Sequence, residues 1–446
     1  MSDVTDIHSG IPGSIRARNL ALAELATCPT WLAGFRSRAQ RELAAAQFPE
    51  RKSETWKYTS LHALAVSGAL DTTAHVSRDI VPVTAVPALD AWRLVFVNGR
   101  FDAGQSHLPA DASIVISSLV ELPDSEQAAA RELLALTCDS RLPFAAANSA
   151  AFADGALIRV CGEIARPLHV ILHATGDKPA TAQTRLLVRV EPRAALTLIE
   201  QYTGNSADIF TNAVTAIDLG RDAKLTHIRL QFADRRQYFI GSLHLRQQAG
   251  SRCEGFQLMT GSKLRRNDVT CVIAGPGAEL ALQGVYLAGA GDHVDNHVCI
   301  EHVAPHGTSD QLFKGLIGGN GRAVFNGRIH IHPGAKQTAA ELVNNNLLLS
   351  ADAEVDTKPE LEIYNDDVKC AHGATVGQLN EAGVFYLRSR GIAQADAELM
   401  LSLGFVNALV DTVPVAGLAG WIRDECVRWF ATHSSPAATT MDGVHS

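Results

Sequence analysis

The chain has 446 residues, of which 46% are hydrophobic and 19% charged, and a formal net charge of −8 with a pI near 6.1. This composition predicts a globular protein with a large core and more than one structural region. The sequence has no run of eighteen apolar residues, no basic segment followed by an apolar one near its start, and no Lys/Arg cluster interleaved with aromatic residues, so we expect a cytoplasmic protein that binds neither membranes nor nucleic acid.

The N-terminal part of the sequence favours helices. Residues 1–13 mix glycine and proline with polar residues and predict a disordered tail. Residues 14–90 are predicted to form a helical region, because apolar residues recur on one helical face at Trp31, Leu32, Phe35 and Leu43. Residues 53–60 are predicted to form a loop, which the Trp56 side chain anchors against these helices. The Val, Ala and Pro residues of 82–87 favour a linker or an edge strand.

Strand signals begin at about residue 91. Asn98-Gly99 can supply the positive φ angles of a tight turn and predicts a hairpin. Asp124 or Ser125 is expected to cap a helix through residues 128–136. After Pro143 a stretch of small residues leads into further strands, and strands then dominate, which makes 91–376 the predicted β core.

A repeat of about 28 residues runs through this core. Small residues recur at intervals of 28, 28, 27, 29 and 28, at Ala195, Ala223, Ser251, Ala278, Gly307 and Ala335. Aliphatic strand residues recur at intervals of 28, 28, 27, 31 and 32, at Ile217, Leu245, Ile273, Ile300, Ile331 and Ile363. Short strands separated by Gly, Asn and Asp turns at this step predict a solenoid, most simply a parallel β-helix. Propeller blades need about 40–45 residues each, so the step is too short for a propeller.

Past Gly377 the apolar period changes from that of a strand to that of a helix. Residues 377–432 are predicted to form helical segments broken at Gly391, with a third segment after Pro414 and Gly420, followed by a disordered tail over 433–446. A solenoid needs its terminal coils covered, so we expect these helices to cap it. The alternative is that their apolar side chains meet another protein, a role open to Leu399, Leu403, Phe405 and Leu409.

Strand alternation places Cys370 and His372 on one face of the last coil. A thiolate and an imidazole so placed could share iron or zinc, or the imidazole could activate the thiol. The alternative is that both are structural and inert, because most cysteines behave as small buried hydrophobes. The eight cysteines form no C-x-x-C pair, and disulfides are not expected.

A second group of potential metal ligands comprises His293, His297, Cys299, His302 and His306. Alternation places His297, Cys299 and Glu301 on one face and His302 on the other. The spacing matches no closed zinc signature, so a polar flank that faces solvent is the alternative to a metal site. His330 and His332 also face outward and extend that flank.

Two common catalytic signatures are missing. The sequence contains neither a G-x-x-x-x-G-K-[ST] phosphate loop nor a G-x-S-x-G nucleophile elbow. The glycine-rich segments 275–277 and 318–321 lie between strands and predict turns. We therefore do not expect this chain to bind ATP through a phosphate loop of its own.

A set of segments carries a resemblance to a known family. They are Trp56–Thr59, Asn148 with Asp154-Gly155, Gly327–Ile329 with Thr338, Leu347–Ser350, Lys358–Ile363 and Asp366–Thr375. In these segments, and along nearly its whole length, the chain is similar to the SufD family, the scaffold subunit of the Suf iron–sulfur cluster assembly machinery. The block Asp366–Thr375 favours SufD over the related SufB, which carries an acidic pattern around its corresponding histidine.

The resemblance implies a right-handed parallel β-helix core flanked by N-terminal and C-terminal helical regions. It implies a heterodimer with SufB, a homodimer when the chain is isolated, and docking of the SufC ATPase on the C-terminal helices. It also implies that His372, with Cys370 as the second candidate, lies at the SufB interface as an iron-directed group. No cofactor is then bound tightly by this chain alone, since iron or a cluster is held transiently at the interface and ATP enters through SufC.

The resemblance thus implies a non-catalytic subunit. The alternative, which rests on the solenoid alone, is a β-helix enzyme acting on acidic polysaccharide.

Overall fold

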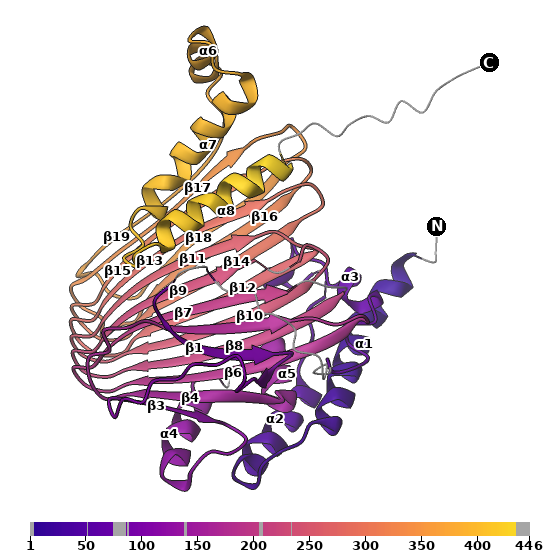
Figure 1. Ribbon diagram of the computed structural model, residues 1–446, viewed down its shortest axis with the longest axis vertical. Coiled ribbons are helices and arrows are strands. Elements are labelled where there is room, and N and C mark those ends of the chain that lie inside the picture. Colours follow the sequence, from indigo (N-terminus) through magenta and orange to yellow (C-terminus); the bar gives the residue numbers. More distant parts are fainter. Residues whose placement is uncertain are drawn as a thin grey trace.

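The chain winds back and forth between two β-sheets, so that each sheet receives every second strand (Figure 1). The computed structural model describes residues 4–50, 52–74, 86, 89–137, 141–204, 208–232 and 234–433. The tail predicted over 433–446 lies outside the described residues from 434 onward, and so does most of the segment 82–87.

The two sheets have ten and nine strands. From edge to edge, the ten-stranded sheet consists of β19 (Val368–Gln378), β17 (Thr338–Leu348), β15 (Thr308–Ile317), β13 (Glu279–Ala288), β11 (Arg252–Thr260), β9 (Lys224–Gln231), β7 (Ala195–Gly204), β5 (Leu168–Ala174), β1 (Trp92–Val97) and β2 (Arg100–Phe101). The nine-stranded sheet consists of β18 (Glu354–Ile363), β16 (Arg322–Ile331), β14 (His293–His302), β12 (Leu264–Ile273), β10 (Tyr238–Gln247), β8 (Ile209–Leu219), β6 (Ala180–Val190), β4 (Asp154–Val160) and β3 (Ile114–Ser118).

Within both sheets, neighbouring strands are parallel except β1 with β2 and β3 with β4. Inward-pointing side chains of the two sheets form one continuous apolar core, from Leu94 in β1 to Leu342 in β17. The predicted parallel β-solenoid is confirmed.

The small-residue landmarks mark real positions in the coil. Four of them precede the first residues of strands that pair in register, and these are Ala223, Ser251, Ala278 and Gly307. The aliphatic series is wrong at three of its five steps. Leu245 pairs with Cys271 and not with Ile273, and Ile273 pairs with His302 and not with Ile300. Ile300 pairs with Ile329 and not with Ile331. A shift of two residues keeps a side chain on the same face of its strand, so the error left the predicted inward face correct.

The predicted hairpin at Asn98-Gly99 is confirmed. The two residues have φ angles of 51° and 79° and connect β1 to the antiparallel β2. A Cβ atom on Gly99 would lie 2.3 Å from the carbonyl oxygen of Gln183. This turn therefore requires glycine for both its backbone angle and its close approach to the sheet.

Helices α1 (Val4–Leu25), α2 (Ala33–Ala45), α3 (His62–Val66) and α5 (Pro143–Ala151) pack on the outer face of the nine-stranded sheet (Figure 1). The structure differs from the predicted disordered tail over 1–13, because α1 begins at Val4. Ile11 and Ile15 lie one helical turn apart and face the same apolar cluster. Packing of these apolar side chains outweighs the unfavourable effect of Pro12, which lies inside the helix.

Two further helices correct the sequence-based boundaries. Helix α4 (Asp124–Ala135) begins directly after Pro123, so Asp124 lies in its first turn and accepts a hydrogen bond from Gln127 Nε2 at 2.6 Å instead of capping the helix. The small residues after Pro143 form α5, whose residues are nearly all buried. Alanine is the strongest helix former, and its small side chain lets the helix lie close to the sheet.

Helices α6 (Glu381–Ser389), α7 (Gln394–Val410) and α8 (Leu418–His433) confirm the predicted C-terminal helical segments, with Gly391 at φ 87° between the first two. Helices α7 and α8 lie against the outer face of the ten-stranded sheet and cover apolar residues of β7 to β15. Helix α6 projects beyond the coils (Figure 1) and has no buried residue. In the described ranges no helix combines the length and the apolar character needed to cross a bilayer.

The expectation that these helices cap the terminal coil is wrong. Helices α7 and α8 pack on the apolar outer face of the ten-stranded sheet. The residues of the last strands, β18 and β19, are therefore left half-buried or exposed.

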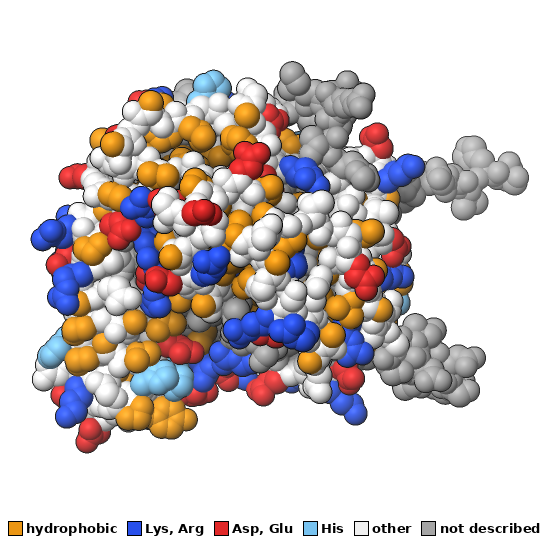
Figure 2. Space-filling model, turned by 90° about the horizontal axis from the view of Figure 1, so that it is seen from below, with side chains coloured by type: hydrophobic (Ala, Val, Ile, Leu, Met, Phe, Trp, Pro, Cys, Tyr) orange, Lys and Arg blue, Asp and Glu red, His pale blue; other side chains and the backbone are white. Residues whose placement is uncertain are grey.

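The two ends of the solenoid differ. At one end the sheets finish in the short antiparallel strands β2, of 2 residues, and β3, of 5 residues. Figure 2 looks at this end and shows positive, negative and apolar side chains interspersed, without a broad patch of one charge sign. At the other end the sheets finish in β18 and β19, which are 10 and 11 residues long and parallel to their neighbours.

The interior of the solenoid also holds a charged network. Glu200 accepts a hydrogen bond from Thr215 Oγ1 at 2.9 Å, and its carboxylate lies 2.6 Å from His227 Nε2 and 3.7 Å from Arg229 Nε. The side chains of Glu200 and Arg229 are 0% and 1% exposed. Burial alone would raise the pKa of Glu200, but the charge of Arg229 and the contact with His227 lower it to about 2. The carboxylate is therefore ionised in the core.

A buried histidine in β5 gives a prediction for the effect of pH on stability. His169 Nε2 lies 2.9 Å from Gln201 Oε1, and burial lowers the pKa of His169 to about 4, whereas histidine in an unfolded chain has a pKa of about 6.5. Because the unfolded chain takes up this proton first as the pH falls, the stability that His169 contributes is complete above about pH 6.5 and is lost between about pH 6.5 and 4, on the order of 3 kcal/mol.

We therefore expect His169→Gln to lose less of its free energy of unfolding than the parent between pH 7 and pH 4.5, as measured by urea denaturation. His306→Gln is the control, because His306 is exposed in a turn. Equal losses in the parent and in His169→Gln would contradict the assignment.

Candidate functional site

The last coil presents the predicted Cys370 and His372 on an edge strand. In β19 Cys370 pairs with Ala340, and His372 pairs with Leu342. Ala340 and Leu342 belong to the interior core. Because paired residues of parallel strands project to the same side of a sheet, both side chains lie on the interior-facing side of the open end.

Cys370 and His372 differ in accessibility. Cys370 is half-buried and packs against the core, and His372 is exposed. Burial raises the pKa of the Cys370 thiol, and a backbone hydrogen bond involving Ala340 opposes this only in part. A Cβ atom on Gly373 would meet no atom within 4 Å, so the space beside His372 is open. His372 is thus ready to meet a partner molecule, whereas Cys370 first needs deprotonation to act as a ligand.

The apolar residues predicted to bind SufC contact the sheet of their own chain. Leu409 is buried, and Leu399, Leu403 and Phe405 are partly buried in the same cluster. The most exposed large apolar side chains of α6 and α7 are Phe385 and Tyr386 on α6 and Met400 on α7, with exposed fractions of 72%, 55% and 51%. An apolar partner surface would therefore meet α6 and the outer side of α7 first.

The segment around Trp56 anchors the N-terminal helices on the nine-stranded sheet. The Trp56 ring lies over the guanidinium of Arg266 at 3.9 Å, and Arg266 Nη1 donates to Asp295 Oδ2 at 2.7 Å. Thr59 Oγ1 donates to the same oxygen at 2.6 Å. Buried Arg266 is thus held by two carboxylates and an aromatic ring, because Asp268 also pairs with it. The interpretation of Trp56 as a packing anchor is confirmed.

Asn148 ties α5 to the sheet in the same way. Its side-chain nitrogen donates to the carbonyl oxygens of Thr184 at 3.1 Å and Asn212 at 2.9 Å, and its oxygen accepts from Arg185 Nε at 3.0 Å. All of its side-chain groups therefore serve to join a helix to β6 and β8.

The second predicted group of ligands is spread over different environments. His293 contacts the Trp56 loop, His297 Nε2 lies 3.0 Å from Asp295, His302 points into the core, and His306 lies in an exposed turn at φ 60°. The predicted alternation of faces is confirmed. These residues do not converge on one point.

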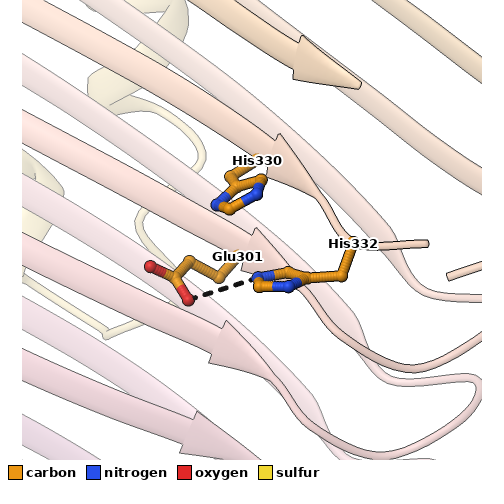
Figure 3. A group of neighbouring side chains, drawn as sticks. All are labelled: Glu301, His330 and His332. Atoms are coloured by element: carbon orange, nitrogen blue, oxygen red, sulfur yellow. Dashed lines mark ion pairs between the residues drawn. The ribbon is translucent and has the colours of Figure 1, made fainter. Parts of the chain in front are cut away.

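A different cluster does converge on the outer face of the nine-stranded sheet (Figure 3). Glu301 of β14 lies opposite His330 of β16, and His332 follows just past the end of that strand. One potential ligand atom from each residue lies within 4.8 Å of the others. Burial is the largest cause of the lowered pKa of His330, and the charges of His332 and Arg328 lower this pKa further.

Comparison with known proteins places this architecture in a family. A family model described as the SUF system FeS cluster assembly, SufBD core domain, matches residues 172–405, and one described as the SufBD protein N-terminal region matches residues 22–168. The iron-sulfur cluster assembly protein SufD of Escherichia coli is 34% identical over 390 residues, which cover 85% of this chain and 88% of the relative.

The chain belongs to the SufBD family of iron–sulfur cluster assembly proteins. A SufBD family protein of Synechocystis is 32% identical over 404 residues, covering 86% of this chain and 88% of the relative. The chloroplastic protein ABCI7 of Arabidopsis thaliana is 28% identical over 397 residues, covering 85% and 82%. The resemblance to SufD expected from the sequence is confirmed.

The SufBD core match contains the open end of the solenoid. It runs from β5 into α7 and includes β19 with Cys370 and His372. The match to the SufBD N-terminal region covers the last residues of α1, together with α2 to α5 and the first strands. The helical anchor and the solenoid are therefore both parts of the family's architecture.

Proposed function

We propose that this SufD homologue is the scaffold subunit of an iron–sulfur cluster assembly complex, in which it pairs with SufB, docks the SufC ATPase and presents His372 to the nascent cluster. One observation carries the proposal. The long parallel strand β19 ends a sheet with its edge unpaired and holds His372 and Cys370 on the interior-facing side. The family is described as one of cluster assembly, which favours a scaffold over the alternative of an enzyme acting on polysaccharide.

Pairing with SufB follows from the chemistry of an open edge. The outer N–H and C=O groups of β18 and β19 offer main-chain hydrogen bonds to a second sheet that approaches end on. A related solenoid is the natural complement, because it brings edges of the same kind and spacing. Iron or a cluster would then be cargo held between the two ends, with His372 as the first ligand from this chain and Cys370 as the second.

SufC docking is assigned to α6 and the outer side of α7. Asn380 Oδ1 accepts hydrogen bonds from the backbone of Ala382 at 3.0 Å and Gly383 at 3.3 Å, which fixes the start of α6. Lys314 Nζ of β15 donates to the carbonyl oxygen of Phe405 at 2.6 Å, which joins α7 to the sheet. A displacement of α6 by an ATP-driven partner would reach the sheet through α7.

Co-expression with SufB and SufC from the same organism tests this arrangement. We expect native mass spectrometry to find all three subunits together. Phe385→Asp with Tyr386→Asp should remove SufC and retain SufB, because the charges fall in the middle of the proposed apolar contact. Deleting residues 380–446 would be less informative, because it would uncover the apolar face beneath α7 and α8.

The matched control is Val66→Asp, which changes an apolar residue of α3 that is 67% exposed. It should leave the complex unchanged. Retention of SufC by the α6 variant would move the docking site elsewhere, and absence of SufB from the parent complex would overturn the scaffold role.

A further inference from the structure

We propose that Glu301, His330 and His332 form a binding site for one divalent first-row transition-metal ion on the outer face of the nine-stranded sheet (Figure 3). This site goes beyond the proposed scaffold function. It faces away from the solenoid interior, and it involves neither the edge strand β19 nor helix α6.

The fold itself brings the three side chains together. His330 and His332 are two residues apart and therefore project to the same side of β16. The parallel register of β14 and β16 then places Glu301 beside His330. The two imidazole rings lie 4.1 Å apart between centroids with an interplanar angle of 24°. Two ligands thus come from one strand and the third from its neighbour, with all three half-buried.

The spacing suits a metal after a small contraction. Zinc–nitrogen and zinc–oxygen bonds of about 2.0–2.2 Å place tetrahedral donor atoms about 3.4 Å apart. The three ligand atoms lie within 4.8 Å of one another, so an ion would have to draw them closer together through side-chain rotation. Two imidazoles and one carboxylate favour a borderline ion such as Fe²⁺, Co²⁺ or Zn²⁺ over Mg²⁺ or Ca²⁺. Three protein ligands also leave a coordination position open.

The unbound cluster leaves its own polar atoms poorly satisfied. His332 Nε2 is buried, has no hydrogen-bond partner among the described residues, and lies 3.5 Å from Glu301 Oε2. That separation is too long for a good hydrogen bond. A cation between His332 Nε2 and Glu301 Oε2 would be bound by both atoms. The direct contact between them at this distance satisfies neither atom well.

The neighbouring charges are compatible with a cation. Arg328 Nη2 lies 3.4 Å from His330 Nδ1, but Arg328 is also paired with both carboxylate oxygens of Glu362. The Glu362 carboxylate thus offsets the arginine charge close to the site. Glu301 and Arg328 line an open groove of about 520 Å³, so the Glu301 side of the cluster is reached from solvent.

The test uses the full-length chain without a histidine tag. We expect it to bind one Co²⁺ with visible d–d absorbance, and Zn²⁺ to displace the Co²⁺ and raise the melting temperature. Glu301→Gln and His330→Gln should each weaken Co²⁺ binding by about 100-fold or more, because loss of a direct ligand exceeds the roughly 10–100-fold cost of losing an outer partner. A titration with Fe²⁺ in the absence of oxygen then allows the affinity for Fe²⁺ to be compared with those for Co²⁺ and Zn²⁺.

Two control variants separate this site from other histidines. His306→Gln removes an exposed histidine five residues along the chain from Glu301, and His107→Gln removes an exposed histidine beside β1. Both should bind Co²⁺ as the parent does. Equal binding by Glu301→Gln and the parent, or no Co²⁺ bound by the parent, would overturn the site and leave an ordinary polar contact. Neither result would change the subunit content of the SufB and SufC complex, so the two proposals fail separately.

Discussion

Replacing Glu200 by glutamine is expected to lower the free energy of unfolding by about 3–5 kcal/mol, the usual cost of removing one partner of a buried ion pair. The Arg229 side chain is 1% exposed, and within the part of the chain that the structure describes two of its guanidinium nitrogens have no hydrogen-bond partner. It therefore depends on the Glu200 carboxylate for compensation of its charge. Glutamine fills nearly the same space but removes that charge, and its amide nitrogen cannot accept a hydrogen bond as the carboxylate does from Thr215 Oγ1. Urea denaturation at pH 7 measures the change.

Two comparisons isolate the electrostatic effect. Glu200→Gln combined with Arg229→Met should recover part of the loss, because the uncompensated charge is then removed as well. Glu354→Gln breaks the pair with Arg322, whose side chains are 51% and 47% exposed, and should change stability by less than about 1 kcal/mol. If Glu200→Gln were as mild as Glu354→Gln, the buried network would contribute little to stability.

Replacing His372 by alanine is expected to abolish cluster formation in the co-expressed complex while leaving the subunits associated. The His372 side chain is exposed and takes no part in the hydrogen bonds found among the described residues, so its removal should not disturb the fold. The open space beside Gly373 allows a partner's backbone or a cluster to reach the imidazole. Cys370→Ala should be milder, because the thiol is half-buried and burial raises its pKa.

The measurement for His372 is the iron–sulfur absorbance of the reconstituted complex, with SufB and SufC content checked on gels. Thermal denaturation of the isolated chain establishes that both variants fold. A normal cluster yield from the His372→Ala complex would return this residue to a structural role.

The solenoid was predictable because its signal repeats. Small residues before successive strands of the ten-stranded sheet and alternating aliphatic residues within the strands recur at nearly the same step, so an error of two residues at Ile273 did not alter the architecture. The start of α1 was not predictable in the same way. Glycine and proline at the start of the chain indicate disorder locally, and only packing against α5 and the sheet reveals the apolar face that contains Ile15.

The candidate sites show the same limit. Alternation within β19 is a local property, and it was enough to put Cys370 and His372 on one face. Glu301 and His330 are 29 residues apart in the sequence and become neighbours only through the register of two strands. The length of one coil, read from the repeat, could have predicted that Glu301 and His330 are neighbours. That prediction also required knowing that both side chains lie on the outward face of their strands.

The unequal ends of the solenoid set a limit on how the molecule can assemble. The short antiparallel strands β2 and β3 present little edge for another sheet to extend, whereas β18 and β19 offer 10 and 11 residues of parallel edge. Two solenoids that join through their long edges therefore turn their blunt ends outward. A third copy would find no equivalent edge to continue the stack, so an association of this kind would stop at a closed pair and would not propagate into a fibre.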